Sequence, residues 1–356
     1  MADTDTPTPP VPAIDFTQLP LPPRDLSWMQ VPTERPAKPV IGEDGFTLKL
    51  ADSGAYAWAP DYWPYQNDTP RGSFPGELGL AAPYTIYEKV EVWADNVADL
   101  YELAIREQWK PATEVAWGSI EPLEEHVEAS LDQVFSNISE QQYNSNGVLM
   151  GWLKEISYGY HEVKLYLATQ VYDHARHVEA FRKRALANGG GLGVQAPGFF
   201  NRTVMAAMKF TELVIYINII RSSFLLALCE HADKLAKSKA DRQLFDLMAN
   251  DLRRHMAYGV EHLRYYLLNG GPDKRRYVLP WVERGEIMMA ADIKRDTAMR
   301  EALILAMGNT VQGGKAALKE LREAQIQKYV RALESATFTG HGPHVNAALQ
   351  ELAANP

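Results

Sequence analysis

The motif Asp-x-x-Arg-His occurs twice in this chain and constrains its fold more than any other feature. The first copy is Asp173, Arg176 and His177, and the second, 78 residues later, is Asp251, Arg254 and His255. In both copies the histidine lies on an apolar helical stripe, and the aspartate lies one turn before it. A buried imidazole, carboxylate or guanidinium needs a partner, so the two helices are expected to face and satisfy each other. The repetition predicts a four-helix core with pseudo-twofold symmetry.

Periodicity along the chain predicts an all-α fold in three parts. Residues 1–40 hold ten of the 22 prolines, and aromatic residues alternate with Pro, Gly and Asp up to about residue 85. This composition predicts an extended arm over 1–85, packed either on its own domain or on a partner subunit. Residues 86–270 are expected to form a helical bundle, and 271–356 a C-terminal helical extension and tail. Apolar repeats predict helices at about 121–156, 159–187, 200–237, 239–268, 281–308 and 313–336, after a first helix that ends at Pro111.

Composition excludes several classes of function. The net charge of −9 argues against nucleic acid as a partner, because binding phosphates requires a basic surface. The single cysteine, Cys229, excludes disulfides within the chain and predicts a cytoplasmic protein.

The apolar run 213–229 contains Arg221 and is short for a bilayer span, so it is expected to be a buried core helix. GGGLG at 189–193 follows a helix rather than a strand, so no nucleotide cofactor is expected.

The two motif segments, DHARHVEAF and DLRRHMAYG, resemble the Asp-Glu-Ala-Arg-His signature of the ferritin-like di-iron carboxylate superfamily. That superfamily includes ribonucleotide reductase small subunits, ligand-binding oxidases and multicomponent monooxygenase hydroxylase chains. The resemblance covers about residues 85–270 and implies a ferritin-like four-helix bundle with additional helices. It also implies a dinuclear metal site, in which two helices supply one Glu each and the other two supply one Glu-x-x-His pair each.

The positions that the resemblance assigns to metal ligands lack most of these carboxylates. Both Glu-x-x-His pairs are altered, because His174 stands three residues before His177 and Leu252 three before His255. Hard iron is poorly served by histidine and leucine alone, so oxygen activation at a complete dinuclear site is not expected.

The two lone glutamates are also largely missing. Glu140 is the one carboxylate found 30–37 residues before His177, and the corresponding segment before His255, YINII at 216–220, has none. The metal ligands, if an ion is bound, are therefore predicted to be Glu140, His174, His177 and His255. The two aspartates and two arginines of the motifs are predicted to hold the histidines in place: Asp173, Arg176, Asp251 and Arg254.

Three functions remain open. In the first, the chain is the metal-poor, β-type partner of a catalytic paralogue in a di-iron oxygenase or monooxygenase, because such hydroxylases pair an active chain with a metal-free chain of the same fold. In the second, it is itself a metal-dependent oxidoreductase with a remodelled, His-rich site that holds a non-haem ion, iron being the expected one. In the third, the bundle binds a small ligand or serves as a scaffold without redox chemistry. The expected partners are a homologous ferritin-like subunit or a second copy of the chain.

Overall fold

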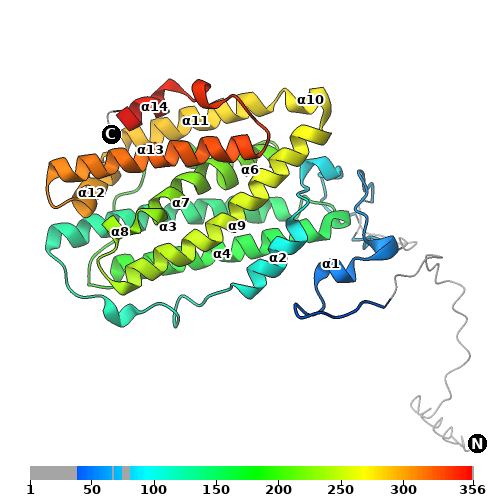
Figure 1. Cartoon of the computed structure of the whole chain (residues 1–356), viewed down its shortest axis with the longest axis horizontal. Coiled ribbons are helices and arrows are strands. Elements are labelled where there is room, and N and C mark those ends of the chain that lie inside the picture. The colour runs from blue at the N-terminus through cyan, green and yellow to red at the C-terminus, as the bar shows by residue number, and fades with distance from the viewer. Residues whose placement is uncertain (1–37, 66–67, 74–80, 355–356) are drawn as a thin grey trace, which may run out of the picture.

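The computed structural model describes residues 38–65, 68–73 and 81–354. The elements that these residues form are all helices (Figure 1). This confirms the all-α prediction. The short arm helix is α1 (Leu48–Ala51), and α2 spans Val97–Arg106. The long elements of the bundle are α3 (Glu125–Leu153), α4 (His161–Leu186) and α9 (Lys239–Asn269). The C-terminal elements are α10 (Gly271–Arg275), α11 (Val278–Arg295), α12 (Thr297–Met307), α13 (Val311–Ser335) and α14 (Ala347–Ala354).

The fourth helix of the bundle is composite. It runs from α6 (Phe210–Val214) through a π-helical segment, Ile215–Arg221, into α7 (Ser222–Glu230), before the short α8 (Ala232–Leu235). Its apolar window is long enough to cross a membrane, yet all of that window is buried inside the bundle. Burial on every side is the environment of a core helix, as predicted for the run 213–229.

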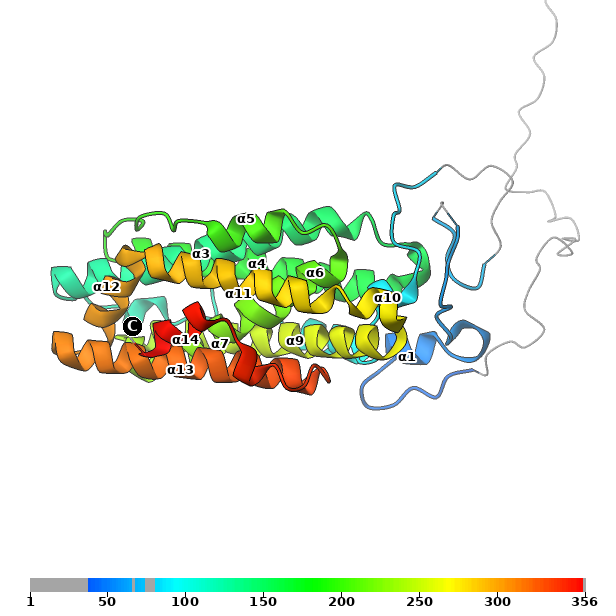
Figure 2. The same ribbon diagram turned by 90° about the horizontal axis from the view of Figure 1, so that it is seen from above.

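The C-terminal helices pack along the bundle rather than beyond it. Figures 1 and 2 show α11, α12 and α13 lying beside the four long helices, with α13 against α7 and α12 against α3. α14 lies over α11 and α13 at the surface (Figure 2).

Two of the predicted helices are interrupted. The helix expected at 200–237 begins as α5 (Phe199–Met205) and breaks before α6, where the Glu212 carboxylate accepts from the Met208 backbone N–H at 2.8 Å. The helix expected at 281–308 breaks at Asp296, whose side chain caps α12 by accepting from the Met299 N–H at 2.9 Å. A side chain that bonds to a nearby backbone N–H competes with the helix in this way.

A polar layer divides the core of the bundle into two hydrophobic clusters. One cluster includes Val163, Tyr166, Ile217 and Tyr258, and the other includes Phe135, Phe181 and Phe245. Along α4 the sequence passes from the first cluster at 163–167 to the second at 180–185, and the buried residues between them are mostly polar. α9 passes from the second cluster to the first in the opposite order, with the second motif in between.

The described part of the N-terminal arm packs on its own bundle. The Leu48 N–H donates to Glu102 of α2 at 2.7 Å, and the Trp63 N–H donates to the Tyr87 carbonyl at 2.9 Å. These bonds agree with the simpler of the two expectations for the arm. Residues 1–37, which hold nine of the 22 prolines, lie outside the described residues.

Candidate functional site

The two Asp-x-x-Arg-His motifs face each other across the polar layer and exchange hydrogen bonds. His177 Nε2 donates to Asp251 at 2.9 Å, and His255 Nε2 donates to Asp173 at 3.0 Å. Each aspartate thus holds the histidine of the opposite helix. All four side chains are at most 2% exposed, so water does not compete for these bonds.

The two arginines complete this reciprocal pattern. Arg176 bonds to Asp173 of its own motif and lies 3.3 Å from Asp251, and Arg254 bonds to Asp251 and lies 3.3 Å from Asp173. Because both carboxylates contact both guanidinium groups, the four charges form one buried network. The pseudo-twofold arrangement predicted from the repeated motif is what the structure contains.

Trp109, from the loop after α2, covers one side of this network. Its indole N–H donates to Asp251 at 2.9 Å, and its carbonyl accepts from Arg176 at 3.0 Å. The guanidinium of Arg176 also stacks over the indole, 4.9 Å from the ring centre.

Gln142 of α3 occupies the centre of the layer. Its Oε1 lies 2.5 Å from His174 Nδ1 and 3.0 Å from His177 Nδ1, so one amide joins two imidazoles. Gln142 lies 35 residues before His177, within the range where the resemblance places a lone glutamate. Sequence reasoning missed it because only carboxylates were considered there.

Asn218 occupies the equivalent place on the composite helix. It lies 37 residues before His255, inside the π-helical segment, and its Nδ2 donates to Gln170 Oε1 at 3.0 Å and to the His255 carbonyl at 2.9 Å. π-helical turns often occur at functional sites, where they re-aim a side chain. Gly259 of α9 permits the close approach of the two helices, because a Cβ at this position would lie 2.5 Å from the Asn218 Cβ.

The variant Gly259→Ala is expected to lose about 1–3 kcal/mol of unfolding free energy, because the added methyl group must push the π-helical segment away from α9. Gly147→Ala in α3 is the matched control: its Cβ meets nothing within 4 Å, and the change should stabilise the chain by about 0.5–1 kcal/mol. Urea unfolding of both variants measures the difference. Equal stability of the two would show that the helix contact at Asn218 is not tight.

The hydrogen-bond directions in the layer follow from one backbone carbonyl. The His255 carbonyl can only accept, so Asn218 presents its NH₂ group, which also donates to the Gln170 oxygen. The Gln170 NH₂ group therefore faces His174 Nε2, 3.3 Å away, and that nitrogen must accept. The proton of His174 is consequently on Nδ1, from which it is donated to Gln142 Oε1.

His177 lies between two oxygen atoms. Its Nδ1 faces Gln142 Oε1 at 3.0 Å, and its Nε2 faces the Asp251 carboxylate at 2.9 Å. Arg176 and Arg254 compensate the charges of Asp173 and Asp251, and Arg254 also donates to Glu107 at 2.6 Å.

Burial favours the neutral form of the other two imidazoles in the layer, those of His174 and His255. Burial lowers the pKa of His174 well below its ordinary value, and the nearby histidines and Arg221 lower it further. Burial also lowers the pKa of His255, against the opposing effect of Asp173. The ring centres of His174 and His255 are 5.0 Å apart, and the Nδ1 atom of His255 has no hydrogen-bond partner among the described residues.

Glu140 does not join the histidines. Its carboxylate accepts from the Ala196 N–H at 3.1 Å and from the Asn201 side chain at 3.3 Å, and burial raises its pKa. Residues two positions apart on a helix point to different faces, so Glu140 and Gln142 cannot both face the layer. Of the four predicted ligands, the structure brings together His174, His177 and His255.

A dinuclear metal centre does not fit these residues. The positions assigned to its four glutamates hold Gln142, His174, Asn218 and Leu252, none of which supplies negative charge. The two aspartates already pair with the two motif arginines and bond to His177 and His255. Two metal ions would bring at least four positive charges into a layer that has no net negative charge to offset them.

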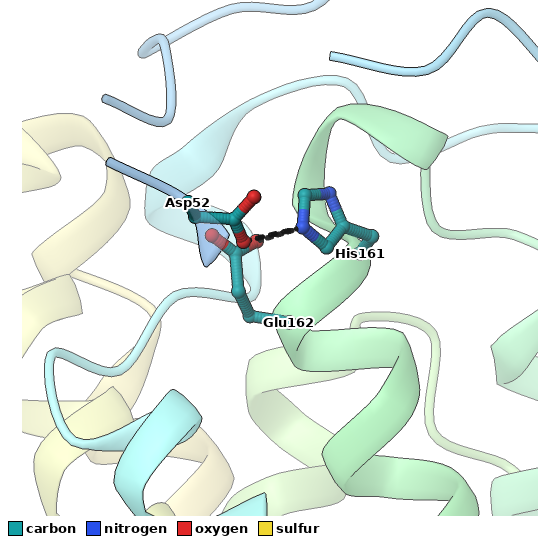
Figure 3. Close-up of side chains that lie close together, drawn as sticks. All are labelled: Asp52, His161 and Glu162. Atoms are coloured by element: carbon teal, nitrogen blue, oxygen red, sulfur yellow. Dashed lines mark hydrogen bonds and ion pairs between the residues drawn. The ribbon is translucent and has the colours of Figure 1, made fainter. Parts of the chain in front are cut away.

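A second cluster lies where the arm meets α4. Figure 3 shows Asp52, His161 and Glu162, which form the one group of three or more His, Cys, Asp or Glu residues in the described chain whose ligand atoms lie within 4.8 Å of one another. Arg71 already contacts both acids, with bonds of 2.9 and 2.5 Å to the Glu162 carboxylate and an ion pair of 3.5 Å to Asp52. The cluster therefore ties the arm to the bundle, and it differs from the four ligands predicted from the sequence.

Comparison with known proteins supports the fold. No protein-family model matches the chain, and no curated protein matches it. Two solved structures of R2-like ligand-binding oxidases are similar to this chain. Each match covers 68% of this chain and 94% of the oxidase chain, at 16% sequence identity. One, with an aerobically reconstituted metal cofactor, has a TM-score of 0.52, and the other, a single-residue variant with a Mn/Fe cofactor, has 0.51. The chain thus has the ferritin-like helical fold that its repeated motif predicted.

Proposed function

We propose that this chain is a metal-free, β-type subunit of a ferritin-like oxygenase assembly, in which a homologous chain carries the metal centre. The hydrogen-bonded layer carries the proposal. At the positions of the four glutamates the chain has neutral or apolar side chains, and Gln142 joins two histidines where the resemblance places a carboxylate that would hold metal. The layer is thus built to be stable without metal.

The surface of the bundle also supports a helical partner. Large apolar side chains recur at seven-residue spacing on α3, at Tyr143 (71% exposed) and Met150 (50%), and on α4, at Leu165 (38%) and Tyr172 (49%). α3 and α4 pack side by side, so these residues lie on neighbouring helices. Exposed apolar side chains of this size are typical of protein interfaces.

Metal content is the first test. The untagged chain, purified from cells supplied with iron and manganese, is expected to contain close to no metal by elemental mass spectrometry. About two ions per chain would refute the proposal, because the layer would then hold a complete dinuclear centre despite its neutral side chains.

The second test concerns the partner. The chain is expected to form a mixed assembly when it is produced together with a homologous chain that has both Glu-x-x-His pairs. Met150→Lys should weaken this assembly, whereas Lys154→Met, at an exposed position just beyond α3, should leave it intact. A purified chain that is monomeric, metal-replete and active would contradict the proposal.

One observation favours an alternative, an oxidoreductase with a single ion held by histidines. His255 Nδ1 has no hydrogen-bond partner in the part of the chain that the structure describes, and the three imidazole rings lie 5.0–6.4 Å apart between centres. This alternative predicts about one ion per chain, which disappears when His177 and His255 are both replaced by alanine. An ion that survives this double substitution would lie elsewhere.

A further inference from the structure

A second polar site lies beside the layer, between the bundle and the C-terminal helices. Here α3, α5, α7, α11, α12 and α13 enclose a cavity of about 80 Å³. One water occupies roughly 30 Å³ in the liquid, so the cavity has room for a molecule of a few heavy atoms. Its walls are largely apolar and include Phe224, Leu228 and Met289.

Two buried arginines line this cavity. Arg221 is 2% exposed and donates only to neutral acceptors, the nearest of which are Asn201 Oδ1 at 2.6 Å and Ser145 Oγ at 2.7 Å. Arg322 of α13 is 8% exposed, and its one hydrogen bond to a described residue goes to Gln325 Oε1 at 2.8 Å. No carboxylate of the described chain lies within the 4.0 Å of an ion pair with either guanidinium. Burial lowers the pKa of Arg221 to about 9 and that of Arg322 to about 10.

The two acids that line the cavity form their hydrogen bonds with neutral groups, although the charge of Asp296 opposes the effect of burial on the pKa of Arg322. Asp292 accepts from the backbone N–H groups of Phe199 and Phe200 at 2.7 and 2.9 Å, at the start of α5. Asp296 accepts from the Met299 N–H at 2.9 Å and from the Asn137 side chain at 3.2 Å. Arg322 therefore retains N–H donors that no carboxylate of the described chain satisfies, and a buried cation in this state favours an anionic partner.

A route from the surface leads to Arg322. A second cavity, of about 110 Å³, shares Ile293 and Arg322 with the first and is also lined by Lys294, Arg300, Glu351 and Leu352. Lys294 pairs with Glu351 at 3.9 Å, so Arg300 is the cation of this cavity that adds to the attraction for an anion. Leu352 belongs to α14, which lies over α11 and α13 (Figure 2), so the C-terminal helix covers this route.

We propose that the cavity beside Arg322 binds a short-chain monocarboxylate, with the guanidinium holding the carboxylate and the apolar walls holding the alkyl group. A monocarboxylate matches one guanidinium with free donors, because the guanidinium fork can bind both carboxylate oxygens. Acetate and propionate, whose alkyl parts have one and two carbons, are the probes that suit a cavity of this size. This inference is independent of the proposed subunit role, because it concerns a different cavity.

Calorimetric titration of the full chain with sodium acetate and sodium propionate, at constant ionic strength set with sodium chloride, tests the site. Both anions are expected to bind. The variant Arg322→Gln should weaken binding by roughly 10- to 100-fold, the range for a lost hydrogen bond to a charged group. Arg331→Gln, at an exposed position on the same helix, is the matched control and should keep the affinity within about twofold.

Several results would overturn the proposal. These are absence of binding to the wild-type chain, unchanged binding to Arg322→Gln, and inorganic phosphate binding as tightly as acetate. Urea unfolding distinguishes a loss of binding from misfolding of the variant. Arg322→Gln removes a buried cation, so it should unfold at the urea concentration that unfolds the wild type or at a higher one. Leu228→Phe, which fills the cavity and keeps both arginines, should also abolish binding of propionate.

Discussion

Replacing Asp251 with asparagine is expected to reduce the unfolding free energy by about 3–5 kcal/mol, the usual cost of removing one member of a buried ion network. Asp251 accepts from His177, from Trp109 and from both motif arginines. Asparagine keeps the shape and loses the charge, so Arg176 and Arg254 would keep only Asp173 as a buried carboxylate partner among the described residues. Both hydrogen bonds and charge balance would be affected.

Urea unfolding at neutral pH measures this change. The control is Asp246→Asn on the same helix, at an acid that is 62% exposed and pairs with Arg242 at 3.5 Å. An exposed pair of this kind contributes less than about 1 kcal/mol. A loss below about 1 kcal/mol for Asp251→Asn as well would show that the network around the motifs is not the buried, fully paired cluster described above.

The unfolding free energy is also expected to fall steeply between pH 7 and pH 5. Burial lowers the pKa of His262 from 6.5 to about 4, although the hydrogen bond to the Trp93 carbonyl opposes this shift. The Nε2 atom lies 2.9 Å from the Thr211 hydroxyl, and the Nδ1 atom lies 2.9 Å from the Trp93 carbonyl. The unfolded chain therefore binds a proton below pH 6.5 that the folded chain does not bind until about pH 4. Stability is full above pH 6.5 and is lost as the pH falls toward 4, by about 2 kcal/mol at pH 5 from this residue.

His262→Gln isolates this contribution. Glutamine offers an N–H to the Trp93 carbonyl and an oxygen to the Thr211 hydroxyl, so both hydrogen bonds can be kept without a titrating group. Between pH 7 and 5 the variant should lose about 2 kcal/mol less than the wild type in urea unfolding. His126→Gln, at an exposed position in the first turn of α3, should follow the wild-type curve. A curve for His262→Gln that coincides with the wild type would show that His262 is already protonated in the folded chain.

The core of the site could be predicted from the sequence because the motif is local. Asp173 and His177 are one helical turn apart, and so are Asp251 and His255, so helical periodicity alone places each set on one inward face. A buried charge must be compensated, and this requirement made it necessary that the two sets meet. The reciprocal bonds between Asp173 and His255, and between Asp251 and His177, follow from that requirement.

The partners of these sets could not be predicted in the same way. The resemblance calls for a carboxylate, which favours Glu140, although Gln142 is the residue that faces the histidines. α3 has a weak apolar pattern, so periodicity does not define its inward face there. Asn218 lies in a segment without a carboxylate, and the π-helical turn that holds it changes the periodicity from which an inward face is inferred.

By itself, then, the sequence determined the all-α class, the paired motifs and the loss of the carboxylates, because these depend on residue type and on contacts within one or two turns. Only the tertiary structure decided which amides complete the layer, how its charges balance, and that α13 brings Arg322 to a cavity beside α7. These features depend on contacts between helices that lie far apart in the chain. Such contacts are set by packing of the whole bundle, and no local pattern records them.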